Sequence, residues 1–158
     1  MQLKIRLMTR RDKPAIMQIL KTAPEFQPAE VTIAEELIDY YLENPSSLDY
    51  RIYVARVESR TVGYICYGPT PLTEGTWDIY WMAVAGDFQG QGIGKAMLAF
   101  AENKIREAHG RLSFIETSSQ PHYEKTRRFH YSQGYELISR IPDFYSPGDD
   151  KLTLWKRL

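Results

Sequence analysis

The stretch Trp77–Ala101 constrains this chain most, because it reads as a strand, a glycine-rich turn and a helix. The apolar pattern predicts a strand over Trp77–Val84, a turn over Gln89–Gly94 and a helix from about Gly92 onward. The first backbone N–H groups of a helix lack partners and carry a partial positive charge. Glycines let a ligand approach these groups closely, because they have no Cβ atom. The stretch therefore predicts a site for an anion, above all for a phosphate.

The register of the turn separates three glycine-rich phosphate motifs. The dinucleotide fingerprint G-x-G-x-x-G requires a glycine where this chain has Lys95. The P-loop pattern G-x-x-x-x-G-K-[ST] requires glycine and Ser or Thr where the chain has Gln89 and Ala96. A third pattern, [Q/R]-x-x-G-x-[G/A], is matched in full by Gln89, Gly92 and Gly94. That pattern is the acetyl-CoA signature of the GNAT N-acetyltransferase superfamily, which this stretch resembles.

The resemblance continues beyond the turn. Thr126–Tyr135 resembles the second motif of the family, a helix that ends in Gly-Tyr or Gly-Phe, and the predicted order βααββ–βαβαββ is also that of the family. The resemblance implies a single GNAT-like α/β domain over residues 1–158, with a mixed, mostly antiparallel sheet of six to seven strands and about four helices. Besides the central stretch, the pattern predicts a strand near residues 3–7, a helix from about Pro14 through Leu20, helices over 29–43 and 121–132, strands over 50–57, 61–67, 112–116, 135–141 and 151–155, and a loop over 142–150.

Composition excludes several classes of partner. Lys plus Arg and Asp plus Glu number 20 each, so net charge provides no reason to expect nucleic acid or an anionic membrane as a partner. No apolar run is long enough to span a membrane. The single cysteine, Cys66, rules out an intramolecular disulfide and favours a cytoplasmic location. Three histidines and one cysteine at no ligand spacing predict no metal site. The sequence permits a homodimer but does not specify one.

The resemblance implies acetyl-CoA as co-substrate. In the family, a bulge separates the strand before the turn from its neighbour, and the pantetheine arm pairs with the backbone thus exposed. Here this implies pantetheine contacts from Met82, Ala83 and Val84. Lys125 and Arg127 are candidates for the 3′-phosphate. The pyrophosphate is expected at Gln89, Gly90, Gln91, Gly92, Ile93, Gly94 and Lys95.

Direct attack of an amine on the thioester requires a base, a donor for the oxyanion and a proton for the thiolate. By resemblance, a backbone N–H at or beside Val84 suits the oxyanion, and Asp78 is the candidate base acting through a water. The usual acid of the family is a tyrosine four residues before the glycine of Gly-Tyr, and His130 occupies that position. We expect His130 to be the acid, because an ordinary imidazole titrates near working pH. Tyr131, Tyr123 and transfer without a dedicated acid remain alternatives.

The acceptor is expected between the first two helices and the last loop. Aromatic residues there, with Asp143, Asp149 and Asp150, favour a cationic amine. The resemblance thus implies transfer of acetyl from acetyl-CoA to a primary amine of a small molecule within a ternary complex. Residues 144–150 also resemble a segment of ribosomal-protein N-terminal acetyltransferases, so a protein or peptide amine is one alternative and a non-catalytic CoA-binding module is another. The candidate acceptor contacts are Phe26, Tyr40, Tyr41, Phe144 and Tyr145.

Overall fold

The computed structural model describes residues 2–158, which form one seven-stranded sheet with the order β1-β2-β3-β4-β5-β7-β6. Strands β4 and β5 run parallel, and the other neighbouring pairs are antiparallel. This confirms the mixed, mostly antiparallel sheet. The strands are β1 (Leu3–Leu7), β2 (Arg51–Val57), β3 (Arg60–Pro69), β4 (Thr76–Val84), β5 (Leu112–Ser118), β6 (Glu136–Ser146) and β7 (Asp149–Arg157).

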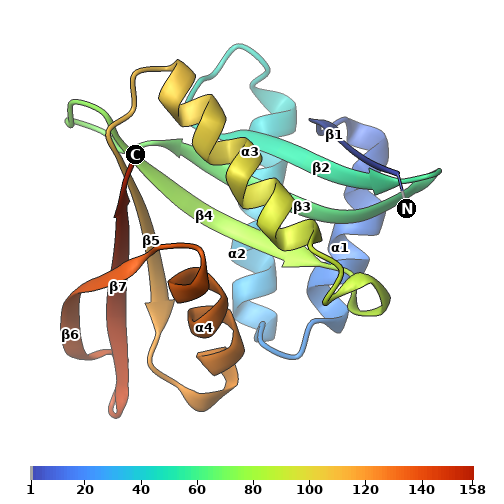
Figure 1. Cartoon of the computed structure of the whole chain (residues 1–158). Helices are drawn as coiled ribbons and strands as arrows, with labels where there is room; N and C mark the ends of the chain where they lie inside the picture. Colours follow the sequence, from blue (N-terminus) through green and yellow to red (C-terminus); the bar gives the residue numbers. More distant parts are fainter. Residues whose placement is uncertain (1) are drawn as a thin grey trace.

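Helices cover both faces of the sheet, α1 and α2 on one face and α3 and α4 on the other (Figure 1). Their bounds are α1 (Lys13–Thr22), α2 (Pro28–Glu43), α3 (Ile93–Glu107) and α4 (Glu124–Ser132). Short 3₁₀ helices precede α1, α3 and α4 at η1 (Arg10–Asp12), η2 (Gly86–Phe88) and η3 (Pro121–Tyr123).

Helical spacing of apolar residues accounts for the packing of these layers. In α1, Ile16 and Leu20 are four residues apart and fully buried against the sheet. In α3, Met97 and Ala101 repeat the same spacing on the opposite face. Full burial of one aliphatic side chain of this size contributes about 1.5–3 kcal/mol. The two helical layers therefore hold the central strands between them.

Strand β4 departs from regular pairing twice. Against β3, Cys66 lies opposite Trp81 and Tyr67 opposite Ile79, so Tyr80 is an extra, bulged residue. Against β5, pairing extends only from Thr76–Leu112 to Ile79–Ile115, although β4 continues to Val84. The two strands diverge beyond that point, as Figure 1 shows. The expected bulge is thereby confirmed, and the edge of β4 over residues 80–84 has no partner on the β5 side.

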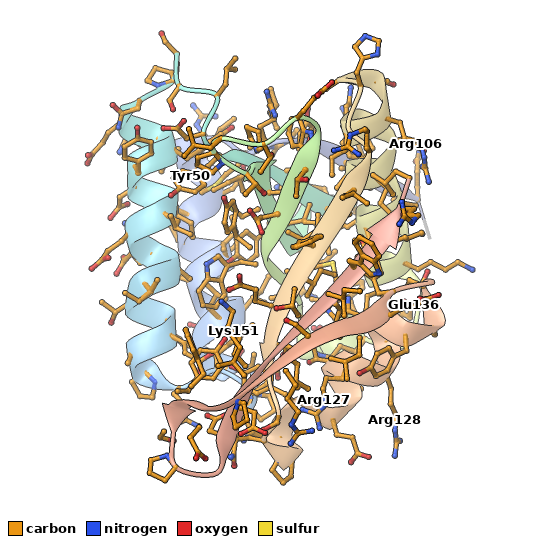
Figure 2. All side chains as sticks on the ribbon, turned by 90° about the vertical axis from the view of Figure 1, so that its left-hand side faces the viewer. Tyr50, Arg106, Arg127, Arg128, Glu136 and Lys151 are labelled. Carbon is orange, nitrogen blue, oxygen red and sulfur yellow. The ribbon has the colours of Figure 1, made fainter. Side chains whose placement is uncertain are left out.

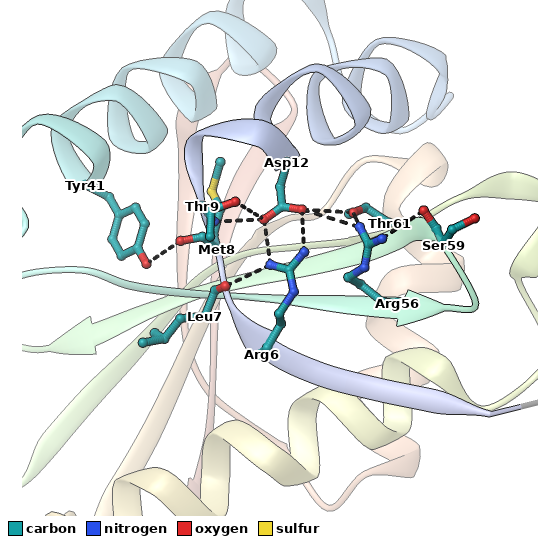
Figure 3. Close-up of polar contacts among 9 residues, drawn as sticks. All are labelled: Arg6, Leu7, Met8, Thr9, Asp12, Tyr41, Arg56, Ser59 and Thr61. Carbon is teal, nitrogen blue, oxygen red and sulfur yellow. Dashed lines mark hydrogen bonds and ion pairs between the residues drawn. The ribbon is translucent and has the colours of Figure 1, made fainter.

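A buried carboxylate fixes the start of α1 to the sheet (Figure 3). Asp12 is 2% exposed and accepts hydrogen bonds from the Arg6 guanidinium at 2.8 and 3.0 Å, from the Thr9 backbone N–H and from the Thr61 hydroxyl. Burial alone would raise the pKa of Asp12, but these bonds outweigh it and lower the pKa to about 2. Beside this cluster the Tyr41 hydroxyl donates to the Met8 carbonyl at 3.0 Å, a contact that joins α2 to the end of β1.

The prediction of a loop over residues 142–150 is wrong. Strand β6 continues to Ser146, β7 begins at Asp149, and the turn between them uses Gly148 at φ 81°. All residues of β6 are exposed, so the strand lacks the alternation of buried and exposed positions by which a sequence pattern indicates a strand. Carboxylates stabilise the hairpin: Asp143 accepts from the Gly148 N–H and Asp150 accepts from the Asp143 N–H, each at 2.8 Å.

Candidate active site

The loop before α3 presents an anion cradle. Gly90 and Gly92 have φ of 76° and 82°, conformations that side chains other than glycine adopt rarely. The helical bonding of α3 begins when Ala96 N–H donates to the Gly92 carbonyl at 3.0 Å, so the N–H groups of residues 93–95 precede it and point out of the helix end. A Cβ added at either glycine would meet no atom within 4 Å. The donors, the positive helix end and the open space together fit a diphosphate.

Helix α4 contacts this loop at Gln89 and the first turn of α3 at Gly94. The Gln89 side chain donates to the Val84 carbonyl at 3.2 Å and accepts from the Lys125 ammonium at 3.0 Å. A Cβ added at Gly94 would lie 3.5 Å from the Phe129 ring, which is ordinary contact. The Lys125 ammonium therefore lies at the mouth of the cradle, where a phosphate could replace Gln89 as its partner.

The second cation expected at the cofactor has a structural contact instead. The Arg127 guanidinium donates to the carbonyls of Ser118 and Gln120 at 2.7 and 2.9 Å, so it holds the connection between β5 and α4. A phosphate role for Arg127 stays a prediction. Lys95 is exposed at the start of α3 and forms no ion pair within residues 2–158.

Asp78 lies on the α2 side of the sheet, one residue before β4 and β5 separate. The Thr70 hydroxyl donates to its carboxylate at 2.5 Å. Burial raises the pKa of Asp78, and hydrogen bonds from Thr70 and Tyr80 partly oppose this rise. The charges of Glu116 and Lys151, which pair with each other at 3.2 Å, also act on this carboxyl group. A half-buried carboxyl group with a raised pKa next to the point where β4 and β5 separate suits a general base.

His130 is buried on the inner side of α4. Its side chain is 4% exposed, packs against Phe129 and Tyr135, and leaves Nδ1 without a hydrogen-bond partner. Burial lowers its pKa to about 4. The expectation that this imidazole titrates near neutral pH was wrong, because a charged ring is poorly solvated in this environment. A neutral, buried imidazole is a poor candidate for the acid that the resemblance implies.

The two alternative tyrosines occupy different environments. Tyr131 is 42% exposed and is rotated by about 100° around α4 from His130. Tyr123 in η3 is partly buried, and its hydroxyl donates to the Glu30 carboxylate of α2. Burial raises the pKa of Tyr123, and the hydrogen bond to Glu30 raises it further. This contact joins η3 to α2.

Aromatic residues line the α2 side of β4. The Phe26 ring meets the Trp81 ring edge-on at 5.7 Å between centroids, and the bulged Tyr80 meets Tyr50 at 5.4 Å. Figure 2 shows Tyr50 and Lys151 between α2 and the sheet, whereas Arg127 and Arg128 lie with α4 on the other side. The sequence did not single out Trp81 or Tyr80, because the bulge that turns both toward α2 is a property of the pairing.

Only part of the expected acceptor set comes together. Tyr40 bonds Asp49 and packs on Tyr50, and Tyr41 bonds Met8, so both belong to the far end of α2. Ten residues of helix, about 15 Å, separate Tyr40 from Glu30. Phe144 and Tyr145 lie half-exposed on β6, and the Lys151 ammonium is 4.7 Å from the Phe144 ring centroid. Glu30, which the sequence analysis did not single out, accepts from the Gln27 N–H at 3.1 Å in the cap of α2.

Two further classes of site are absent from residues 2–158. No helix in this range is long and apolar enough to cross a membrane. Within the same range, no three His, Cys, Asp or Glu side chains are grouped so as to hold a metal ion.

Known proteins resemble the chain over different lengths. An uncharacterised N-acetyltransferase of Methanocaldococcus jannaschii is 30% identical over 105 residues, and the match spans 66% of this chain and 65% of that protein, slightly less than two thirds. A crystal structure from Desulfovibrio desulfuricans, assigned to the GNAT family of acetyltransferases, is 36% identical with a TM-score of 0.92 and covers 99% of both chains.

Two more distant structures share the fold. The ribosomal-protein-S18-alanine N-acetyltransferase of Escherichia coli is 16% identical with a TM-score of 0.76, covering 99% of this chain and 94% of that one. The PaiA N-acetyltransferase of Thermoplasma acidophilum, solved with coenzyme A, is 15% identical with a TM-score of 0.78 over all of both chains. The profile of the acetyltransferase (GNAT) domain matches residues 48–137, more than half of the chain. Together with the separated strands and the glycine cradle, this match shows that the chain belongs to the GNAT acetyltransferase family.

Proposed function

We propose that this protein transfers an acetyl group from acetyl-CoA to a primary amine of a small molecule, by direct attack within a ternary complex. The observation that carries the proposal is the separation of β4 from β5 after Ile79, next to the glycine cradle of α3. Acetyl-CoA supplies the activated thioester when it is bound. The backbone N–H groups of residues 89–95 would hold its pyrophosphate, and the free edge of residues 82–84 would pair with its pantetheine arm.

On the amine side, Asp78 is the proposed base. An ammonium group must lose a proton before it can attack, and a carboxylate can accept that proton through a water. The raised pKa of Asp78 brings its basicity closer to that of the amine. A backbone N–H at or beside Val84 on the free edge of β4 would stabilise the developing oxyanion.

On the sulfur side, we propose that the thiolate takes its proton from water. His130 is neutral near pH 7, because its pKa is about 4, and it therefore has no imidazolium proton to donate. The Tyr123 proton is held by Glu30, and Tyr131 faces outward on α4. A thiol has an ordinary pKa of about 8.5, so its thiolate leaves near neutral pH without an obligatory acid.

Two alternatives remain. The fold shared with the ribosomal-protein acetyltransferase, and the exposed Phe144–Tyr145 pair, favour a protein or peptide amine as acceptor. A module that binds CoA without catalysis is the second alternative. A homodimer and a cytoplasmic location stay predictions.

The test measures free thiol released from acetyl-CoA in the presence of a panel of small amines and N-terminal peptides. We expect turnover with a small primary amine and loss of turnover in Asp78→Asn. Turnover with peptides alone would contradict the small-molecule acceptor. Tight binding of CoA without turnover on any amine would favour the non-catalytic module.

A further inference from the structure

A cavity of about 260 Å³ lies on the α3 side of the sheet, at the opposite end of α3 from the glycine cradle (Figure 1). It is enclosed by the starts of β2 and β4, the end of β3 and the last turn of α3. The 15 residues of α3 span about 22 Å, so a small molecule in this cavity would not reach the cradle. The cavity is also separate from the proposed acceptor contacts, which lie on the α2 side of the sheet.

Three aromatic rings form the walls of the cavity. Tyr53 and Tyr67 stack with their centroids 6.2 Å apart, and Tyr67 meets Trp77 at 6.1 Å. Tyr67 is 1% exposed and Trp77 is 6% exposed, so packing in the core holds both rings in place. An apolar cavity of about 150 Å³ is large enough for benzene. This cavity therefore has room for one six-membered ring with a small substituent.

One charged side chain among these rings lacks a partner. The Arg51 guanidinium lies on the Trp77 ring, with Cζ 4.6 Å from the ring centroid. Its Nη1 is buried and has no hydrogen-bond partner among residues 2–158, and the same part of the chain offers Arg51 no ion pair. Buried polar groups are nearly always hydrogen-bonded, so an exception indicates a missing partner. The planar N–H groups of a guanidinium fit a carboxylate.

The other charges at the cavity balance each other. The Lys104 ammonium lies 3.7 Å from the Glu107 carboxylate at the exposed side of the cavity. Burial raises the pKa of Tyr67, and the charges of Arg51 and Glu107 act on this hydroxyl in opposite directions. Since Lys104 compensates Glu107, the charge of Arg51 leaves the lining of the cavity positive. A cavity of this sign attracts an anion.

We infer that this cavity binds a small aromatic carboxylate, whose carboxylate group accepts hydrogen bonds from Arg51 and whose ring packs against Tyr67 and Trp77. The site is a second binding site that is independent of acetyl transfer. Its ligand needs no amino group, so it is not the acceptor.

The test is calorimetry of the full chain with benzoate, with neutral benzamide and cationic benzylamine as probes of the same shape. We expect benzoate to bind with a Kd of about 1 mM or tighter, the range open to a ligand of this size. Benzamide and benzylamine should bind about tenfold more weakly or not at all, because neither replaces the carboxylate. Saturation with CoA should leave the affinity for benzoate unchanged, because the cradle lies at the other end of α3.

Substitutions at the cavity should change this affinity in opposite directions. Arg51→Gln should weaken benzoate binding by about tenfold or more, and Arg51→Lys should recover only part of the loss because it lacks the planar fork. Glu107→Gln should strengthen binding by about twofold, since it removes a partly solvated negative charge. Glu107 lies on the surface, so this variant keeps the test decisive if Arg51→Gln does not fold.

The matched control is Arg106→Gln, because Arg106 is an exposed arginine of the same helix that bonds Asn103 at 2.9 Å and does not line the cavity. It should leave benzoate binding unchanged. The inference is overturned if benzoate fails to bind at about 10 mM. Equal affinities for benzoate and benzamide, displacement of benzoate by CoA, or equal effects of Arg51→Gln and Arg106→Gln would also overturn it. None of these outcomes bears on acetyl transfer, which the release of thiol measures separately.

Discussion

The Lys125 ammonium donates to the Gln89 side-chain oxygen at 3.0 Å, and this bond joins α4 to the cradle loop that follows β4. The other end of the Gln89 amide donates to the Val84 carbonyl. The first residue of the acetyl-CoA signature therefore spans from the end of β4 to α4. Its polar side chain orders the loop, and the glycines after it leave space for the ligand.

Lys125→Gln should raise KM for acetyl-CoA by about three- to tenfold with kcat near that of the parent, because one phosphate loses a cation. The effect should shrink at high salt, which screens exposed charges. Steady-state kinetics at two ionic strengths test this. The control is Arg128→Gln, since Arg128 is exposed and paired with Glu124 at 2.9 Å. An equal effect in both variants would contradict a specific role for Lys125.

Gly92→Ala should destabilise the protein by about 1–2 kcal/mol, the cost of a left-handed conformation for a residue with a Cβ atom. It should also weaken CoA binding, because the new methyl group projects into the open side of the cradle. Gly86→Ala is the control, since Gly86 lies outside the signature, its φ is not positive and an added Cβ would meet no atom within 4 Å. Urea unfolding and CoA calorimetry measure the two effects. Similar losses in both variants would argue against the cradle.

Thr70→Val should move the acid limb of the kcat/KM profile to higher pH. The Thr70 hydroxyl donates to the Asp78 carboxylate and stabilises its charged form, so removal of this donor raises the pKa of Asp78 further. A base acts only when unprotonated, so activity would be lost at a higher pH than in the parent. Asp78→Asn should lower kcat by about a hundredfold or more. An unmoved acid limb in Thr70→Val would mean that another group sets it.

His130→Leu should make the free energy of unfolding less sensitive to acid. The pKa of His130 in the folded chain, about 4, lies below the ordinary value of 6.5. Between these two values the unfolded chain binds a proton that the folded chain does not bind. The resulting stability is complete above about pH 6.5 and is lost as pH falls toward 4, by about 2 kcal/mol at pH 5. Urea unfolding at pH 7.5 and pH 5 should show a smaller difference in the variant. An unchanged difference would contradict the depressed pKa.

The same residue tests the sulfur side of the mechanism. If water protonates the thiolate, His130→Ala should keep the kcat of the parent between about pH 6 and 9, provided the variant remains folded. Tyr131→Phe is the matched control and should behave likewise. A loss of about a hundredfold in kcat for His130→Ala, with KM unchanged and the fold intact by circular dichroism, would restore the imidazole as the acid.

Local signals account for what the sequence predicted well. The central strand was expected over Trp77–Val84 and is observed as Thr76–Val84, and the second helix was expected over residues 29–43 and begins at Pro28. Apolar periodicity, glycines at turns and proline at a helix start each involve only a few consecutive residues, so they can be recognised in the sequence. Residues 142–150 were misread as a loop because the β6 residues among them are exposed, and their pairing with β7 is made by contacts across the turn.

The sequence alone determined the ligand class, because the register of Gln89, Gly92 and Gly94 is a property of six consecutive positions and excludes the two rival phosphate motifs. It could not determine what surrounds a side chain. The burial of His130, the bulge at Tyr80 and the contact of Tyr123 with Glu30, 93 positions apart, arise only when strands and helices pack. Those three features decide which groups can carry a charge or a proton, since pKa values and hydrogen bonds depend on neighbours in space.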